Sequence, residues 1–219
     1  IHYIGSLFGL ESKVFPIKDV WHTLLPIRGL QRGFSLKSIL RNIMLPFRIV
    51  NSLLKTNNIL KEFEPDVVIG TGGYASAIPL YMISKRNDST TIILQEQNSF
   101  PGITTRLFAK RANKVCIAFE EPNNTLGDNT VITGNPVRKG IGEGNKKNGF
   151  YEFNLKEKNK TIFLFGGSQG SAYLNKLIGE IAEKISNSGI QLLWQTGDLE
   201  FQKYNHLESE NIRITPFIN

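Results

Sequence analysis

Two glycine-rich segments of the sequence have the composition of phosphate-binding turns: residues 70–75 (GTGGYA) and residues 166–170 (GGSQG). Each follows an apolar run and precedes a helical pattern, so each is predicted to join a strand to a helix. Glycine leaves the first N–H groups of the helix uncovered, and those donors and the helix dipole favour a phosphate. A tight turn without a ligand also favours glycine, and this alternative stays open at both segments.

Polar residues follow other apolar runs, at residues 95–98 (QEQN) and 134–138 (GNPVR). Ligands bind beyond the carboxyl ends of the strands in open parallel sheets, so these residues are candidates for the same sites. Glu96 and Asn98 suit sugar hydroxyls, and the planar guanidinium of Arg138 suits a phosphate or a carboxylate. The alternatives are a helix cap for Asn98 and a solvated charge for Arg138.

The elements that would position these residues alternate between strand and helix, which predicts a parallel α/β fold in two halves. The strands are predicted at residues 1–4, 65–69, 90–94, 115–119, 130–133, 161–165, 191–194 and 212–217. Loop is predicted for the rest of residues 1–34. We expect one domain at 1–138, a polar linker or domain edge at 139–160, and a second domain from 161 to 219.

An amphipathic helical pattern follows residue 35 and is expected to break at Pro46. The apolar stripe includes Ile43, Phe47 and Val50, and Arg41 and Arg48 flank it. An apolar face bordered by cations is typical of a helix at a membrane surface with anionic lipids. The alternative is an ordinary helix that packs its stripe into the core.

The chain has 219 residues and a net charge of +7, and the whole excess of cations lies in residues 1–140. Seven cations, beginning at Arg28, lie between Asp19 and Glu62 with no acid among them. This stretch predicts an anionic partner. Aromatic residues are not interleaved with the cations, so nucleic acid is not favoured. No apolar run is long enough to span a bilayer, and the single cysteine, Cys116, cannot form a disulfide within the chain. The three histidines lack metal-ligand spacing, so no metal is expected.

Gly70, Gly72 and Ala75 also satisfy the pattern G-x-G-x-x-A, with Glu96 at the end of the following strand. That is the fingerprint of a nicotinamide or flavin dinucleotide site, so a dinucleotide-dependent oxidoreductase is the alternative function. Residues 166–170 lack the lysine and the following Ser or Thr of a nucleoside triphosphatase loop, which excludes that class.

Four motifs in order resemble the MurG family of N-acetylglucosaminyltransferases of peptidoglycan synthesis: GTGGYAS (70–76), QEQNSFPGITTRLFAKRANKV (95–115), TGNPVR (133–138) and FGGSQGSAYLN (165–175). The resemblance implies two Rossmann-like domains facing across a cleft, the glycosyltransferase B-type fold, without a cofactor. It implies inverting transfer of N-acetylglucosamine from UDP-N-acetylglucosamine to the C4 hydroxyl of undecaprenyl-pyrophosphoryl-N-acetylmuramyl-pentapeptide.

The resemblance also implies roles for individual residues. The donor-side residues would be Asn98, Arg138, Gly167, Ser168 and Gln169, and the acceptor-side residues Thr71, Gly72, Gly73, Tyr74 and Glu96. The stripe at Ile43, Phe47 and Val50 would contact the cytoplasmic face of the cell membrane, where the protein would be peripheral. Other family elements, including a histidine-bearing loop, would lie outside residues 1–219, so these residues by themselves are expected to have little or no transferase activity.

Overall fold

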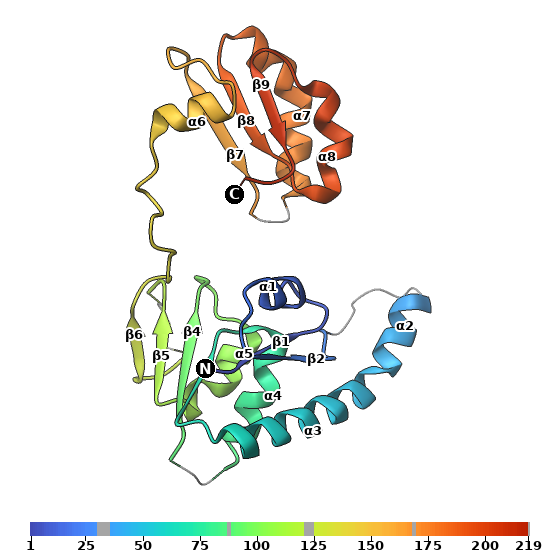
Figure 1. The fold of residues 1–219 in the computed structure, drawn as a ribbon, viewed down its shortest axis with the longest axis vertical. Coiled ribbons are helices and arrows are strands. Elements are labelled where there is room, and N and C mark those ends of the chain that lie inside the picture. The colour runs from blue at the N-terminus through green and yellow to red at the C-terminus, as the bar shows by residue number, and fades with distance from the viewer. Residues whose placement is uncertain (30–35, 87–88, 121–124, 168–169, 219) are drawn as a thin grey trace. The chain divides into compact units, whose positions relative to one another are not determined.

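The computed structural model describes residues 1–29, 36–86, 89–120, 125–167 and 170–218, without the side chains of residues 36–39. The chain forms two compact units, Ile1–Val137 and Arg138–Asn219 (Figure 1). Every pair of named strands in both units is parallel. The predicted parallel α/β class is therefore confirmed.

The first unit begins with a two-stranded sheet that sequence analysis predicted only in part. β1 (Tyr3–Ser6) is followed by α1 (Glu11–Ile17) and by β2 (His22–Leu25), which pairs with β1. The prediction of loop after β1 was wrong. Helix α1 contains Pro16 and has no buried residue, so it lacks the apolar period that identifies a helix in sequence.

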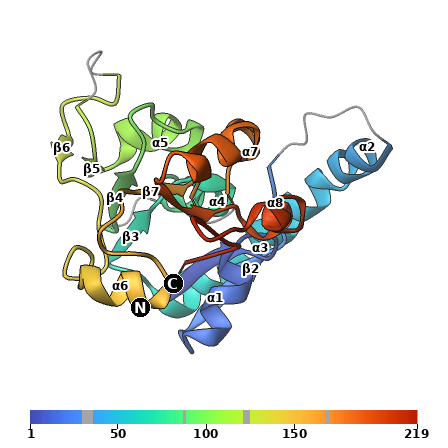
Figure 2. The same cartoon turned by 90° about the horizontal axis from the view of Figure 1, so that it is seen from above.

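The amphipathic region forms two helices, α2 (Leu36–Ile43) and α3 (Leu45–Phe63). Pro46 lies in the first turn of α3, where a missing N–H leaves no hydrogen bond unmade. The predicted break at this proline is confirmed. Helix α3 then packs along α4 (Gly73–Ile83) (Figure 2).

The rest of the first unit is a four-stranded sheet in the order β3-β4-β5-β6, with helices between its strands. The elements are β3 (Val67–Gly70), α4, β4 (Thr91–Glu96), α5 (Ile103–Phe108), the 3-10 helix η1 (Ala109–Arg111), β5 (Lys114–Ile117) and β6 (Thr130–Ile132). Leu80 of α4, Leu94 of β4 and Val115 of β5 are buried in one apolar core. This core holds the carboxyl ends of the strands in fixed positions.

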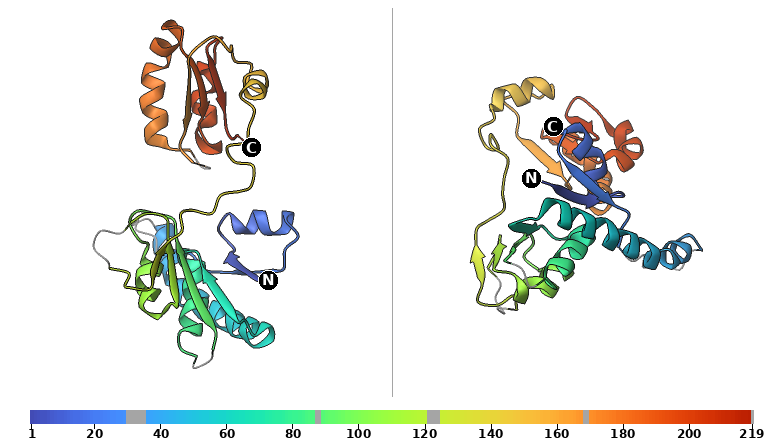
Figure 3. Two further views of the ribbon diagram at one scale, coloured as in Figure 1. Left: turned by 90° about the vertical axis from the view of Figure 1, so that its left-hand side faces the viewer. Right: turned by 60° about the horizontal axis from the view of Figure 1, so that its bottom comes forward.

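The second unit has a three-stranded sheet in the order β7-β8-β9. The elements are α6 (Lys146–Glu152), β7 (Thr161–Phe165), α7 (Ala172–Asn187), β8 (Gln191–Gln195), α8 (Asp198–Tyr204), the 3-10 helix η2 (Asn205–Leu207) and β9 (Ile212–Thr215). Helices α6 and α7 lie on opposite sides of this sheet (Figure 3). Trp194 of β8 is fully buried, and its indole N–H donates to Asn175 of α7 over 2.9 Å.

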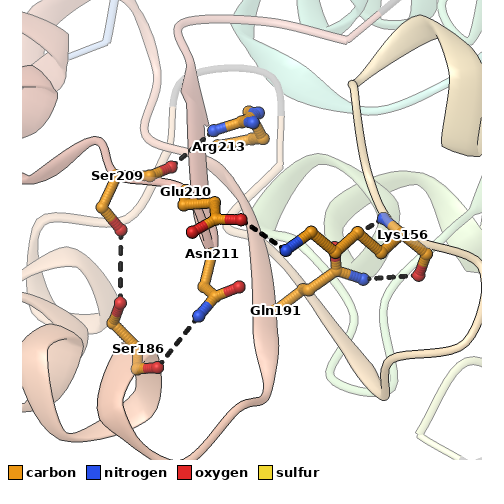
Figure 4. A network of polar contacts seen from close by, with 7 residues as sticks. All are labelled: Lys156, Ser186, Gln191, Ser209, Glu210, Asn211 and Arg213. Atoms are coloured by element: carbon orange, nitrogen blue, oxygen red, sulfur yellow. Dashed lines mark hydrogen bonds and ion pairs between the residues drawn. The ribbon is translucent and has the colours of Figure 1, made fainter.

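Polar contacts attach the segment before β7 to the edge of this unit (Figure 4). The buried Gln191 side chain accepts a hydrogen bond from the backbone N–H of Lys156 (2.6 Å) and donates one to the Lys156 carbonyl oxygen (2.8 Å). Lys156 also forms an ion pair with Glu210. The segment at 139–160, which was predicted as a linker or domain edge, thus contains a helix and packs with the second unit.

Candidate functional site

The glycine-rich turn of the first unit leaves the N-terminus of α4 open. Gly72 and Gly73 have φ angles of +86° and +75°, which favour glycine, and no side chain caps the helix. A Cβ atom added at either glycine would have no neighbour within 4 Å. The first N–H groups of α4 are therefore free of side-chain cover and suit an anion.

A cavity of about 440 Å³ lies at this helix end. Its lining comes from the segments after β1 and β2 and from the start of α4: Ser6, Phe8, Gly9, Glu11, Ile27, Arg28, Gly29, Gly72, Gly73, Tyr74 and Ala75. Three of the predicted acceptor-side residues, Gly72, Gly73 and Tyr74, thus line this cavity. Thr71 is not part of the lining; its carbonyl oxygen accepts a hydrogen bond from Gln97 Nε2 over 3.2 Å.

Arg28 lines the same cavity, and sequence analysis did not single it out from the other cations. Its guanidinium carbon lies 3.7 Å from the centre of the Phe8 ring, and that of Arg48 lies 5.0 Å from the same ring. Arg28 Nε is buried and has no hydrogen-bond partner among the described residues. Burial, and then the nearby cations Arg41 and Arg48, lower the pKa of Arg28. A partly desolvated cation beside two other cations is stabilised by a bound anion, so this position favours one.

Glu96, at the end of β4, is buried and fully hydrogen-bonded within its own unit. Its side chain is only 2% exposed, and its carboxylate accepts hydrogen bonds from Thr105 Oγ1 (2.6 Å), the Gly102 N–H (2.8 Å), and both the Asn98 N–H (3.1 Å) and the Asn98 side-chain amide (2.8 Å). Burial alone would raise the pKa of Glu96, but these hydrogen bonds outweigh it and lower the pKa. The carboxylate therefore holds the loop that leads into α5, and the place of Glu96 on the acceptor side stays a prediction.

Polar residues at the end of β4 and after β4 and β6 contact one another at the carboxyl edge of the first sheet. Gln95 Nε2 donates to Asn135 Oδ1 over 3.4 Å, and Asn135 Nδ2 donates to the Gln97 carbonyl oxygen over 3.3 Å. Asn98 is exposed, and its amide is oriented by Glu96. Arg138 is exposed at the start of the second unit. The structure thus places Asn98 where a ligand can reach it.

The glycine-rich turn of the second unit is more tightly held. A Cβ at Gly166 would lie 2.4 Å from the Ser171 nitrogen, and one at Gly170 would lie 1.9 Å from the Thr196 oxygen. Gly167 has a φ of +77° and an open surrounding, and its carbonyl oxygen accepts a hydrogen bond from Gln195 Nε2 over 2.8 Å. Two predicted donor residues, Ser168 and Gln169, lie outside the described residues.

The apolar stripe of α2 and α3 is exposed on the first unit. Ile43 is 62% exposed, Phe47 71% and Val50 56%, so the core-facing alternative is wrong for these side chains. Arg41 and Arg48 are half-buried beside them. In the part of the chain that the structure describes, no helix is long and apolar enough to cross a membrane. The same residues include no cluster of three or more His, Cys, Asp or Glu side chains suited to a metal ion.

Several known proteins with similar sequences carry the same name. The chain is 40% identical over 223 residues to a Flavobacterium psychrophilum protein named UDP-N-acetylglucosamine–N-acetylmuramyl-(pentapeptide) pyrophosphoryl-undecaprenol N-acetylglucosamine transferase. Proteins of the same name from Christiangramia forsetii and Bacillus subtilis are 37% and 34% identical. The alignments cover 99% or 100% of this chain but only 59% or 60% of those relatives.

Solved structures share the fold. The crystal structure of Acinetobacter baumannii MurG matches with a TM-score of 0.60 at 20% identity, over 97% of this chain and 56% of that one. The UDP-GlcNAc 2-epimerase of Neisseria meningitidis, solved with UDP-GlcNAc bound, matches with a TM-score of 0.55 at 15% identity, over 95% of this chain and 61% of that one. None of these matches supports the oxidoreductase alternative.

Family assignment rests on both units. Residues 1–117 match the glycosyltransferase family 28 N-terminal domain, and residues 161–219 match the family 28 C-terminal domain. The first match alone spans more than half of the chain, and the second begins at β7, next to the second glycine-rich turn. The chain therefore belongs to glycosyltransferase family 28.

Proposed function

We propose that the protein transfers N-acetylglucosamine, with inversion, from UDP-N-acetylglucosamine to the C4 hydroxyl of a muramyl-pentapeptide carried on undecaprenyl pyrophosphate. The observation that carries this proposal is the cavity at the start of α4. Residues that carry the open helix N–H groups and Arg28, whose Nε has no partner among the described residues, line this one cavity. Both substrates contain a diphosphate, and each unit of the chain has a glycine-rich turn suited to one.

The acceptor diphosphate belongs, in this proposal, to the cavity of the first unit. Gly72 and Gly73 offer N–H groups without steric cover, and Arg28 offers a planar fork that matches phosphate oxygens. The ring of Tyr74 lies over Gly29, where an added Cβ would be 2.3 Å from Tyr74 Cε2. Tyr74 thus closes one side of the cavity against backbone that only glycine permits.

The donor belongs to the turn of the second unit. Gln195 fixes the Gly167 carbonyl, so the backbone of the turn is held in place before the ligand arrives. Ser168 and Gln169 remain proposed donor contacts, together with Gly167, Asn98 and Arg138. N–H groups aimed at the diphosphate stabilise the negative charge that develops as UDP leaves, which is the main electrostatic contribution to such a reaction. Glu96 acts indirectly in this proposal, because its carboxylate accepts a hydrogen bond from the Asn98 side-chain amide and so orients Asn98.

Binding can be tested without turnover, by amide chemical shifts of the labelled chain. We expect pyrophosphate to shift the amides of Gly72, Gly73 and Tyr74, and UDP-N-acetylglucosamine to shift those of Gly166 and Gly167. Arg28→Ala should abolish only the pyrophosphate response. Lys110→Ala, at an exposed cation of η1, is the matched control and should leave both responses intact. If neither ligand shifts its glycine turn, the proposed function is wrong.

We also propose that the exposed stripe binds the cytoplasmic face of the cell membrane, where a lipid-linked acceptor is available. The stripe faces solvent, and a groove lined by Pro46, Phe47, Val50, Asn51 and Leu54 lies on it. Phe47→Glu should abolish co-sedimentation with vesicles of phosphatidylglycerol and phosphatidylethanolamine. Tyr151→Glu, at an aromatic residue of α6 that is 92% exposed, should not change it. If both variants sedimented equally with the vesicles, the proposal that the stripe contacts the membrane would be wrong.

A further inference from the structure

One aromatic ring at the cavity of the first unit is shared by two arginines from different segments. The ring belongs to Phe8, which is among the residues that line the cavity at the start of α4. The guanidinium carbon of Arg28, in the segment after β2, lies 3.7 Å from the ring centre. That of Arg48, in α3, lies 5.0 Å from the same centre. Both distances are short enough for attraction between a cation and the face of an aromatic ring.

The backbone beside this ring is held by the hydroxyl of Ser6, at the end of β1. Ser6 Oγ donates to the Ile27 carbonyl oxygen over 2.8 Å and accepts the Phe8 N–H over 3.1 Å. One hydroxyl thus joins the segment that carries the ring to the segment that carries Arg28. The ring and the Arg28 guanidinium therefore have a defined relation before any ligand binds.

The cations near this ring have no carboxylate partner in the part of the chain that the structure describes. No ion pair there includes Arg28, Arg41 or Arg48. Glu11 lines the same cavity, but it forms no ion pair with Arg28 among these residues. Like charges held close together repel one another, and the attraction to the Phe8 ring offsets only part of this cost. A multiply charged anion would offset more of it.

A diphosphate matches this pair of guanidinium groups better than a single phosphate does. Each phosphoryl group can accept hydrogen bonds from one planar guanidinium. A single phosphate needs only Arg28 and the open N–H groups of α4, which line the cavity. Arg48 is not part of the lining, so it would reach only the phosphoryl group nearer to α3.

We propose that Phe8 is a positioning residue for the diphosphate of the acceptor and that Arg48 is the second cation of this site. The inference rests on the proposed function, because it adds these residues to the same cavity. The ring holds both guanidinium groups at one place, so the site prefers a diphosphate to a single phosphate. Arg48 directly follows Phe47 of the exposed stripe. A diphosphate attached to an apolar chain therefore meets a cation and an apolar contact on one helix.

The role of the ring is tested by the affinity of the labelled chain for inorganic pyrophosphate, followed at the amides of Gly72 and Gly73. Phe8→Leu removes the ring from a side chain that is 41% exposed, so the core is not disturbed. We expect it to weaken pyrophosphate binding about fivefold. Phe8→Tyr retains the ring and should bind within about twofold of the unaltered chain.

A second ring of the same unit provides the matched control for Phe8. The guanidinium carbon of Arg106 lies 5.2 Å from the centre of the Phe100 ring, which is also exposed. Phe100→Leu should leave pyrophosphate binding unchanged. The positioning role of Phe8 would be overturned if Phe100→Leu weakened binding as much as Phe8→Leu, or if Phe8→Tyr failed to restore it.

The role of Arg48 is tested by comparing inorganic pyrophosphate with inorganic phosphate at constant ionic strength. Arg48→Ala should weaken pyrophosphate binding about tenfold and phosphate binding less than about twofold, because only the diphosphate reaches this cation. Arg106→Ala is the matched control and should change neither affinity. Equal losses for both anions in Arg48→Ala would mean that Arg48 acts only through the general positive charge, and its place in the site would be wrong.

The unaltered chain separates these roles from the proposed function. If its Gly72 and Gly73 amides do not respond to pyrophosphate, the proposed function is wrong. If they respond, but Phe8→Leu and Arg48→Ala bind pyrophosphate as tightly as the unaltered chain, only the roles assigned to Phe8 and Arg48 are wrong.

Discussion

The two glycine-rich turns have the same strand-turn-helix form but differ in how the helix after the turn begins. In the first unit no side chain caps α4, and Gly72 and Gly73 have open space around them. In the second unit the hydroxyl of Ser171 accepts the Leu174 N–H at the start of α7. The first turn thus offers the helix end itself to a ligand, whereas the second offers the loop before the helix.

The strand that follows each turn in the sheet also ends differently. β4 ends at Glu96, whose charge is satisfied by four hydrogen bonds from its own unit. β8 ends at the neutral Gln195, which donates to the Gly167 carbonyl and accepts the Ile218 N–H over 3.1 Å. A buried carboxylate makes the first site sensitive to pH, and a buried amide does not. The comparison therefore separates a charged, open site from a neutral, tightly packed one.

The largest expected effect lies in the packed turn. Gly170→Ala places a Cβ 1.9 Å from the Thr196 oxygen at a φ of +73°. The clash and the left-handed backbone together should lower the free energy of unfolding of the second unit by about 3 kcal/mol. Gly167→Ala is the matched control, because its φ is +77° but its surroundings are open, and it should cost only about 1 kcal/mol. Urea unfolding, followed by the fluorescence of the buried Trp194, measures the unfolding free energy of both variants. Equal losses of unfolding free energy would contradict the tight packing around Gly170.

A second large effect is expected at the charged strand end. Glu96→Gln replaces a carboxylate oxygen by an amide group that donates toward existing donors, so we expect a loss of about 2 kcal/mol in the unfolding free energy of the first unit. Glu120→Gln, at an exposed carboxylate of the same unit, is the control and should change little. Native-state hydrogen exchange of the β4 amides measures both variants. A loss no larger than that of the control would show that the four hydrogen bonds contribute little.

The pH dependence of the first unit should follow the same residue. The folded pKa of Glu96 lies below its ordinary value of 4.5, so its stabilisation is present above pH 4.5 and is lost as pH falls through the folded pKa. The difference in unfolding free energy between the unaltered chain and Glu96→Gln should therefore shrink between pH 6 and pH 3. Measuring only this difference removes the other carboxylates from the comparison. A difference that grows on acidification would mean that the pKa of Glu96 is raised.

The parts of the fold that could be predicted from the sequence are those set by residues close together in the chain. The strands at residues 67–70, 161–165 and 191–195 and the break at Pro46 follow from apolar runs and from proline geometry, which act within a few residues. Helix α1 was missed because it buries nothing and thus has no apolar period.

The charged part of the site was harder to predict, because its contacts join residues far apart in sequence. Arg28 is distinguished from the other cations by its place in the cavity lining and by its contact with the Phe8 ring, twenty positions earlier. Glu96 is an acid at the end of a strand, as many ligand contacts are. Its hydrogen bonds from the Gly102 N–H and Thr105 Oγ1, which give it a structural role, cannot be read from the sequence. Residue type at a strand end predicts a polar site but does not predict which polar groups already have partners.

The smallest expected effect tests whether the cap of α7 is separate from ligand binding. Ser171→Ala removes one capping hydrogen bond and should lower the unfolding free energy of the second unit by about 1 kcal/mol. Ser171→Gly retains a favoured N-cap residue and should cost only a few tenths of that. Because Ser171 already accepts the Leu174 N–H, the proposed contact of the donor diphosphate is with the loop before Ser171. Affinity for UDP-N-acetylglucosamine, measured by calorimetry, should then be unchanged in both variants, since neither alters the loop glycines. A tenfold loss of affinity in Ser171→Ala would make this hydroxyl a ligand contact, and the two turns would then use their helix ends alike.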